Sequence, residues 1–477
     1  MQHLKNRWRS EGGYREVLVV AIPLILSTAT WSVQHFVDRM FLTWYSPEAI
    51  AAAMPAGMLN FSMTSIFMGT AGYLSTFVAQ YYGAKRYHRI GPALWQGVYV
   101  SLLGGLVILC AIPFAEPVFR LVGHSPLVQQ NEVAYFQILC LGAGAYSASY
   151  ALSGFFSGRG KTWPVLWVNA ATTVVNLVLD YALIFGRWGF PELGIKGAGI
   201  ATVVAGVFSL LMFFGLLCSR SNNDTFHTIK GWRLERDLFV RLLRYGFPSG
   251  VQFFLEMAGF TAFVLLVGRL GIASLAATNI AFNINTLAFM PMIGCGIAVS
   301  VLVGQYLGSD KPDRAQSSVY SGFHLTLAYM LSIAAAYVLV PDVFVAPFAL
   351  RADPKEFSEI YGYSIILLRF VAVYSVFDTM NIVFCSAIKG AGDTRYVMLV
   401  TVVLSVFVFV MPVYLAVVVF EFGLMVAWVF ATAYIISLGF IFYLRFLGGK
   451  WRAMRVIERR EEVPMLKPTK LGRVAKL

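Results

Sequence analysis

Long apolar runs separated by short polar connections dominate this chain. A helix needs about 20 apolar residues to cross a bilayer, and runs of that length recur twelve times in the 477 residues. Lipid cannot satisfy backbone N–H and C=O groups, so each run is predicted to be a helix and not a strand. The pattern therefore predicts an all-α integral membrane protein. We expect its spans at 17–45, 49–81, 91–114, 130–157, 162–186, 196–219, 238–269, 274–307, 318–348, 359–388, 395–419 and 423–447.

The composition agrees with this prediction. Hydrophobic residues make up 58% of the chain and charged residues 13%, whereas a soluble protein carries about 25% charged residues. The net charge of +13 comes from Lys and Arg in the short connections. Most of them lie at the amino terminus, in the even-numbered loops and in the tail, so both termini are expected in the cytoplasm. No fold that could present a basic face to a duplex is visible, which argues against nucleic acid as a partner.

The chain also repeats itself. A shift of 225 residues places Pro23 on Pro248, Gln80 on Gln305, Tyr81 on Tyr306 and Gly83 on Gly308, and a shift of 232 places Gly158 on Gly390. Each half holds an even number of spans, so the halves are predicted to be parallel six-helix repeats related by an axis along the membrane normal. The expected domains are an amino-terminal lobe with its linker (1–232), a carboxy-terminal lobe (233–447) and a basic cytoplasmic tail lying along anionic headgroups (448–477).

Only a few acids lie within the predicted spans. They are Asp38, Asp180, Glu256 and Asp378, and four residues before them, in the same order, stand Gln34, Asn176, Gln252 and Tyr374. A spacing of four brings side chains together on one helical face. A carboxylate inside a membrane costs about 2.5–3.5 kcal/mol on insertion scales and is a functional candidate by default. Oxygen-rich groups of this kind suit a proton or a monovalent cation, although ion pairs with Arg39 or Arg369 would give them a purely structural role.

The acids are not part of the repeat. Under the 225-residue shift, Asp38 falls on Phe263 and Glu256 falls on Trp31. An architectural role would more naturally appear in both halves. We therefore expect each half to own a separate ionisable site.

Several motifs together resemble one known family. They are Pro23 with Asp38 fifteen residues later, Val78-Ala79-Gln80-Tyr81-Tyr82-Gly83, Asn176 through Asp180-Tyr181, and Glu256 with Asp378 in the second half. In these residues the chain resembles the multidrug and toxic compound extrusion (MATE) transporters, and the second-half acids resemble the NorM-type subgroup. The resemblance covers about residues 14–447.

The resemblance implies a function and a set of site residues. It implies a secondary active antiporter of the bacterial inner membrane, functional as a monomer and without a cofactor, that exchanges inward H⁺ or Na⁺ for outward amphipathic, cationic compounds. The matching cation or proton positions are Asp38, Asn176, Asp180 and Thr202 in the first half and Glu256 and Asp378 in the second; Gln34, Gln252 and Tyr374 would support them, and Pro23 matches the proline at which the first helix bends.

Three alternatives remain open at this stage. A flippase of lipid-linked oligosaccharides shares the fold, but it would be expected to carry basic residues in its cavity. A channel would need a ring of selectivity groups, which single, unrepeated acids do not provide. For a membrane enzyme, the sequence shows neither zinc-type His spacing nor clustered aspartates, so no enzyme is expected.

Overall fold

The computed structural model describes residues 7–349 and 354–458, and all regular secondary structure in these two ranges is helical. Within these ranges, twelve segments are long and apolar enough to cross a membrane, which confirms the predicted fold class. The first six are formed by α2 (Tyr14–Tyr45), α3 (Pro47–Gly72) continued by α4 (Leu74–Gly83), α5 (Ile90–Leu109), α7 (Pro126–Gly158), α8 (Trp163–Phe185) and α9 (Ile195–Leu217).

The second six repeat this organisation. They are formed by α11 (Arg236–Gly268), α12 (Ile272–Gly308), α13 (Pro312–Leu339), α15 (Pro354–Ala391), α16 (Thr394–Leu404) continued through α17 (Met411–Tyr414), and α18 (Leu424–Leu447). Three short helices lie between the long ones: α6 (Ala115–Val122), α10 (Arg220–Phe226) and α14 (Pro341–Ala349).

Several expected spans are not continuous α-helices in the structure, and two of the breaks divide a predicted run into two α-helices. The run predicted at 318–348 ends as a helix at Leu339, and α14 begins separately at Pro341, because a proline has no N–H to continue the preceding helix. The run predicted at 49–81 is divided between α3 and α4 at Tyr73. Neither break changes the number of membrane-crossing segments.

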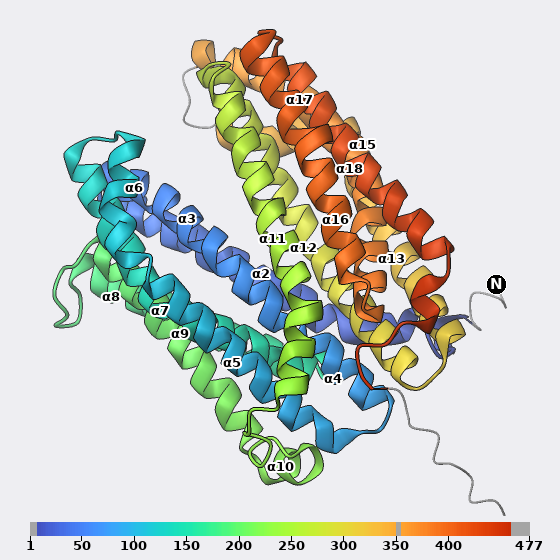
Figure 1. Ribbon diagram of the computed structural model, residues 1–477. Helices are drawn as coiled ribbons and strands as arrows, with labels where there is room; N and C mark the ends of the chain where they lie inside the picture. Colours follow the sequence, from blue (N-terminus) through green and yellow to red (C-terminus); the bar gives the residue numbers. More distant parts are fainter. Residues whose placement is uncertain (1–6, 350–353, 459–477) are drawn as a thin grey trace, which may run out of the picture.

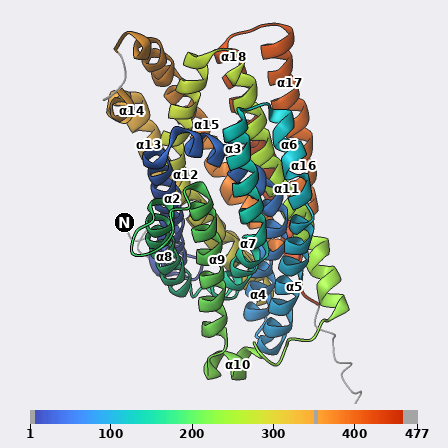
Figure 2. The same ribbon diagram turned by 90° about the vertical axis from the view of Figure 1, so that its left-hand side faces the viewer.

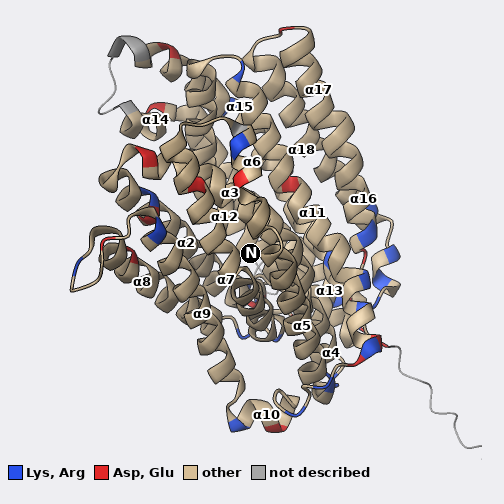
Figure 3. Ribbon diagram, turned by 60° about the vertical axis from the view of Figure 1, so that its left-hand side comes forward, with Lys and Arg blue, Asp and Glu red and all other residues tan. Residues whose placement is uncertain are grey.

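The two groups of helices converge at one end of the molecule and diverge toward the other (Figure 1). We call the end that holds α4 and α10 the closed end, and the end that holds α6, α14 and α17 the open end (Figures 1 and 2). In the first bundle, α7, α8 and α9 pack side by side, and α2 packs on α8 (Figure 2). Lys and Arg gather at the closed end, around α4, α10 and the beginning of α16 (Figure 3).

The bundles meet where glycines allow backbones to touch. A Cβ added to Gly69 of α3 would lie 2.7 Å from the Cα of Gly250 in α11, and one added to Gly294 of α12 would lie 2.8 Å from the N of Ile25 in α2. The 225-residue shift places Gly69 on Gly294 and Ile25 on Gly250. The sequence repeat is therefore also a repeat in space, with matching contacts between the two bundles.

Candidate functional site

A stripe of polar side chains on α8 faces α2. Its members begin at Thr162, the residue before the helix, and follow one another at intervals of seven, four, three and four residues, which keeps them on one face of a helix. Three of them bond to α2 or its backbone: Thr162 Oγ1 donates to the Val20 carbonyl (3.1 Å), Asn169 Nδ2 to Ser27 Oγ (2.6 Å) and Thr173 Oγ1 to the Thr30 carbonyl (3.4 Å). Pro23 lies inside α2, which continues through it as one helix. The stripe thus holds α2 beside α8 over several turns.

The same stripe leads to the first acidic site. Asn176 and Asp180 are its next members, and both side chains are completely buried. The Asp180 carboxyl faces that of Asp38 on α2, close enough for each to act on the other's charge. The two helices therefore bring together three of the four residues expected at this site.

This site is short of hydrogen bonds. Both carboxyl oxygens of Asp180, both polar side-chain atoms of Asn176 and Oδ1 of Asp38 are buried without a partner among the described residues. An unsatisfied buried polar group costs about 1–3 kcal/mol. A shared proton, a cation or ordered water is thus needed to balance the site.

The other residues expected here are placed differently. The Thr202 hydroxyl donates to the Ala198 carbonyl in its own helix (3.0 Å), and Gln34 forms no side-chain hydrogen bond in the described part of the chain. Tyr135 of α7, which the sequence did not single out, lies close enough to Asp38 and Asp180 to interact electrostatically with both carboxyl groups. A tyrosine on a neighbouring helix gives no signal in the spacing along α2 or α8.

The second acidic site lies between α11 and α15. Gln252 Nε2 donates to Glu256 Oε1 at 2.9 Å, so the predicted pairing one turn apart is confirmed. Asp378 is 6% exposed, and its Oδ1 accepts from Asn381 Nδ2 at 2.9 Å.

Tyr374, the expected supporting residue, forms no hydrogen bond with Asp378. The Tyr374 ring stacks on Trp428 of α18, with centroids 6.5 Å apart, and its hydroxyl forms no hydrogen bond within the described ranges. The tyrosine nevertheless lies close enough to Asp378 for the two groups to act on each other's charge. Packing between helices, which the spacing along α15 does not reveal, places the ring against Trp428. Asn381, three residues after Asp378, takes that place.

Glu256 and Asp378 are close enough to act on each other's charge, and Lys389 of α15 lies near Glu256. The sequence did not single out Lys389. It lies on α15 three helical turns after Asp378. No described ion pair within 4 Å joins any of the four acids to a lysine or arginine. Arg39 and Arg369 are exposed and form no described ion pair with these acids, although Arg39 is close enough to act on the charge of Asp38.

The repeated motif has a separate role, at the closed end. Gln80 is fully buried, and its Nε2 donates across the molecule to the Gly390 carbonyl at 3.0 Å. Gln305 Nε2 donates in the other direction, to the Gly158 carbonyl at 2.8 Å. The sequence shifts place Gln80 on Gln305 and Gly158 on Gly390. The two bonds are thus repeat-related, and each joins one bundle to the other.

The tyrosines of the motif extend this symmetry. Tyr81 of the first bundle donates to Glu458, which follows α18 (2.9 Å), and Tyr306 of the second bundle donates to Glu16 of α2 (2.7 Å). Both contacts again cross between the halves of the chain. We call the glutamine and tyrosine contacts together the clamp.

The segment after α18 completes the clamp. Residues 450–458, which we call the strap, pack against the protein instead of lying along lipid headgroups as predicted for the tail. Trp451 is 2% exposed and stacks on Phe446 at 4.9 Å, and the Val456 N–H donates to Gln80 Oε1 at 2.8 Å. The remaining tail, residues 459–477, lies outside the described residues.

Glu458 ties the strap to both bundles. Its carboxylate pairs with Arg89 (3.1 Å) and Arg86 (3.7 Å) of the first bundle and with Arg241 of α11 (2.9 Å). Burial alone would raise the pKa of Glu458, but the hydrogen bonds that it accepts, including that of Tyr81, and the nearby arginines hold that pKa below its ordinary value. The carboxylate therefore stays ionised at neutral pH and keeps the strap in place.

Comparison with known proteins identifies the family. The family model MatE matches residues 23–182 and, a second time, residues 248–415. Together the matches cover more than half of the chain, and they begin at the two prolines related by the repeat. The chain belongs to the MatE family. The double match supports the internal duplication independently of the structure.

Curated relatives agree with this membership. The "Probable multidrug resistance protein NorM" of Thermotoga maritima is 24% identical over 457 residues, covering 93% of this chain and 94% of that protein. The "Multidrug resistance protein NorM" of Burkholderia vietnamiensis is 28% identical over 381 residues, covering 80% and 82%. This MATE protein is therefore of the NorM type.

Solved structures show the same fold. A transporter of the MOP superfamily from Pyrococcus furiosus superposes with a TM-score of 0.83 at 18% identity, covering 94% of this chain and 98% of that chain. The eukaryotic MATE transporter AtDTX14 superposes with a TM-score of 0.82 at 18% identity, covering 92% and 96%. At this level of identity the likeness concerns the fold alone.

Proposed function

We propose that this MATE transporter is an antiporter that exchanges inward H⁺ or Na⁺ for outward amphipathic, cationic organic compounds. The observation that carries the proposal is the pair of separate carboxyl sites, one in each bundle, whose acids lack partner arginines among the described residues. The relatives named for multidrug resistance support the substrate class. So do the aromatic residues, 15% of the chain, because aromatic faces attract organic cations.

The proposed orientation places the closed end in the cytoplasm. Lys and Arg gather there, and cytoplasmic loops carry the excess of these residues. In this orientation the two bundles diverge on the side away from the cytoplasm, and the clamp holds them together on the cytoplasmic side. Both termini would lie on that side of the bacterial inner membrane.

Coupling follows from what the ion does at the sites. Two neighbouring ionised carboxylates in a buried site repel each other, so a proton or Na⁺ that binds between Asp38 and Asp180 is favoured. A ligand shifts a conformational equilibrium only by its difference in affinity for the two states. Ion loading would therefore favour one arrangement of the bundles, and ion release the other.

The membrane potential limits the stoichiometry. One charge that crosses 100 mV contributes about 2.3 kcal/mol, but a one-for-one exchange of a monovalent drug for a monovalent ion moves no net charge. Steep export of a monovalent drug then needs the ion's concentration gradient or more than one ion. Two acidic sites would allow the transporter to bind more than one ion for each drug molecule.

Transport in proteoliposomes tests the proposal directly. Proton and sodium gradients are imposed separately, and movement of a fluorescent organic cation against its gradient is followed. The proposal requires that at least one of the two gradients drives this movement. Movement that is equal with and without both gradients would refute antiport.

The second site gives a prediction of its own. Glu256→Gln keeps the hydrogen bond to Gln252 but removes the negative charge, so any sodium-driven transport is expected to fall at least about tenfold. The measurement is the initial rate of drug movement under a sodium gradient in proteoliposomes. Glu192→Gln, at an exposed loop position, serves as the control. Unchanged sodium stimulation in the Glu256 variant would show that this carboxylate does not bind the ion.

A further inference from the structure

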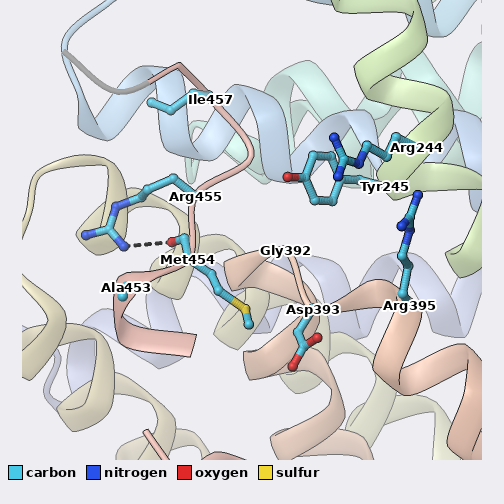
Figure 4. Close-up of a pocket in the computed structure, with 9 residues that line it drawn as sticks. All are labelled: Arg244, Tyr245, Gly392, Asp393, Arg395, Ala453, Met454, Arg455 and Ile457. Atoms are coloured by element: carbon cyan, nitrogen blue, oxygen red, sulfur yellow. Dashed lines mark hydrogen bonds between the residues drawn. The ribbon is translucent and has the colours of Figure 1, made fainter. Parts of the chain in front are cut away.

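A cavity opens beside the clamp at the closed end. It has a volume of about 320 Å³ and is lined by residues of α11, by the turn and first residues of α16, and by the strap. Figure 4 shows Arg244 and Arg395 on one side and the strap residues Met454 and Arg455 on the other. Liquid water occupies about 30 Å³ per molecule, so the cavity has room for a hydrated polar group.

The charges around this cavity are unbalanced. Its one acid, Asp393, is already neutralised by Arg445, whose Nε lies 2.7 Å from Oδ2. Arg455 is held by Asp310 (3.1 Å). Arg244 and Arg395 are exposed and have no ion pair or side-chain hydrogen bond within the described part of the chain. Two free guanidinium groups therefore border a cavity without a free carboxylate.

The chemistry of these groups selects a ligand class. Guanidinium groups bind phosphate with two parallel hydrogen bonds, which makes arginine the preferred residue for planar recognition of phosphate oxygens. The cavity lies where α16 begins, and the N–H groups in the first turn of a helix also favour anions. Tyr245 adds a hydroxyl on the same wall (Figure 4).

We propose that this cavity binds a phosphate group, supplied by the headgroup of an anionic lipid of the cytoplasmic leaflet or by free phosphate. The location of the cavity at the cytoplasmic surface rests on the orientation given in the proposed function. The binding of phosphate by its arginines does not depend on that orientation. The arginines come from α11 and α16, whereas the opposite wall is the strap.

Occupancy of the cavity is coupled to the clamp. In the structure, the strap that forms this wall is held by the bond from Val456 to Gln80 and by the ion pairs of Glu458 with the arginines of the first bundle. A phosphate held between the two arginines and the strap would bind this closed arrangement more tightly than one in which the strap has left. It would therefore stabilise the closed cytoplasmic side.

The experiment measures binding without transport. The purified full-length protein in detergent is titrated with phosphatidylglycerol, phosphatidylcholine or inorganic phosphate. Amide hydrogen exchange of residues 450–458 and the thermal midpoint are recorded. Phosphatidylglycerol is expected to slow exchange in the strap and raise the midpoint, with no effect of phosphatidylcholine. If millimolar inorganic phosphate gives the same protection, the source is free phosphate; if it gives none, the source is the lipid headgroup.

Two double variants separate a site from general surface attraction. Arg244→Gln/Arg395→Gln removes the proposed ligands, and Arg233→Gln/Arg236→Gln removes the same charge from exposed residues of the same end that do not line the cavity. The first pair should raise the half-saturating lipid or phosphate concentration at least about tenfold more than the second, a difference of about 1.4 kcal/mol.

The proposal would be refuted if the two double variants raised the half-saturating concentration equally. It would also be refuted if no phosphate compound slowed hydrogen exchange in the strap. The single variants Arg244→Gln and Arg395→Gln each keep the test decisive if the double variant expresses poorly. Because none of these readouts uses transport, a negative result leaves the antiport proposal standing. A failure of ion coupling likewise leaves the phosphate site to be judged by its own measurements.

Discussion

Asp38→Asn is expected to abolish drug export while the protein still reaches the membrane and folds. The amide has nearly the shape of the acid, but it can neither take up a proton nor offer Na⁺ a negative charge. The new amide would lie beside Asp180 in a buried site. In that site five side-chain atoms of Asp38, Asn176 and Asp180 have no hydrogen-bond partner among the described residues. Asp180→Asn should have the same effect, because the two carboxyls act on each other.

The measurement is the rate of efflux of a fluorescent cation from cells with matched amounts of protein in the membrane. We expect a fall of at least about tenfold, which corresponds to about 1.4 kcal/mol. Asp224→Asn, an exposed acid of α10, is the control and should export at the wild-type rate. Wild-type export by Asp38→Asn would show that the first-bundle site does not couple transport to an ion.

Gly83→Ala and Gly308→Ala are each expected to disrupt the closed end. A Cβ on Gly83 would lie 1.9 Å from the Gln305 carbonyl oxygen, and one on Gly308 would lie 2.1 Å from the Gln80 carbonyl oxygen. Both obstacles are backbone atoms, so α4 and α12 must move apart, which also pulls the clamp glutamines from their partners. Overpacking of this kind typically costs about 1–3 kcal/mol.

The thermal midpoint of the purified protein and its transport rate both check this prediction. Each variant should melt several degrees lower and transport at a small fraction of the wild-type rate. Gly215→Ala in α9 is the matched control, because nothing in the described structure lies within 4 Å of its added Cβ. Variants of Gly83 and Gly308 that match this control in both measurements would show that the closed end tolerates wider spacing.

The amino-acid sequence predicts most of the architecture. Apolar runs of sufficient length predicted the twelve spans, because in lipid the backbone can satisfy itself only within a helix or a closed barrel. The repeated Pro, Gln, Tyr and Gly predicted the duplication. The sequence could not say that these residues form a clamp, because each of their bonds joins residues more than a hundred positions apart.

The acidic sites were predictable only along single helices. The spacing of four correctly paired Gln252 with Glu256. It could not bring Asp38 to Asp180, which depends on how α2 packs on α8. It also could not show that Tyr374 stacks on Trp428 and lies near Asp378 without a hydrogen bond to it. Lys389 was missed because its distance from Glu256 is set between α11 and α15.

The central claim is that a small cation on buried acids shifts the balance between two arrangements of the bundles. The most direct test is the distance between spin labels placed on α6 and α14 at the open end, recorded with and without the coupling ion. In the wild-type protein the ion should change the populations of the two distances, and in Asp38→Asn/Glu256→Gln the populations should not respond. An equal response in that double variant would contradict the account.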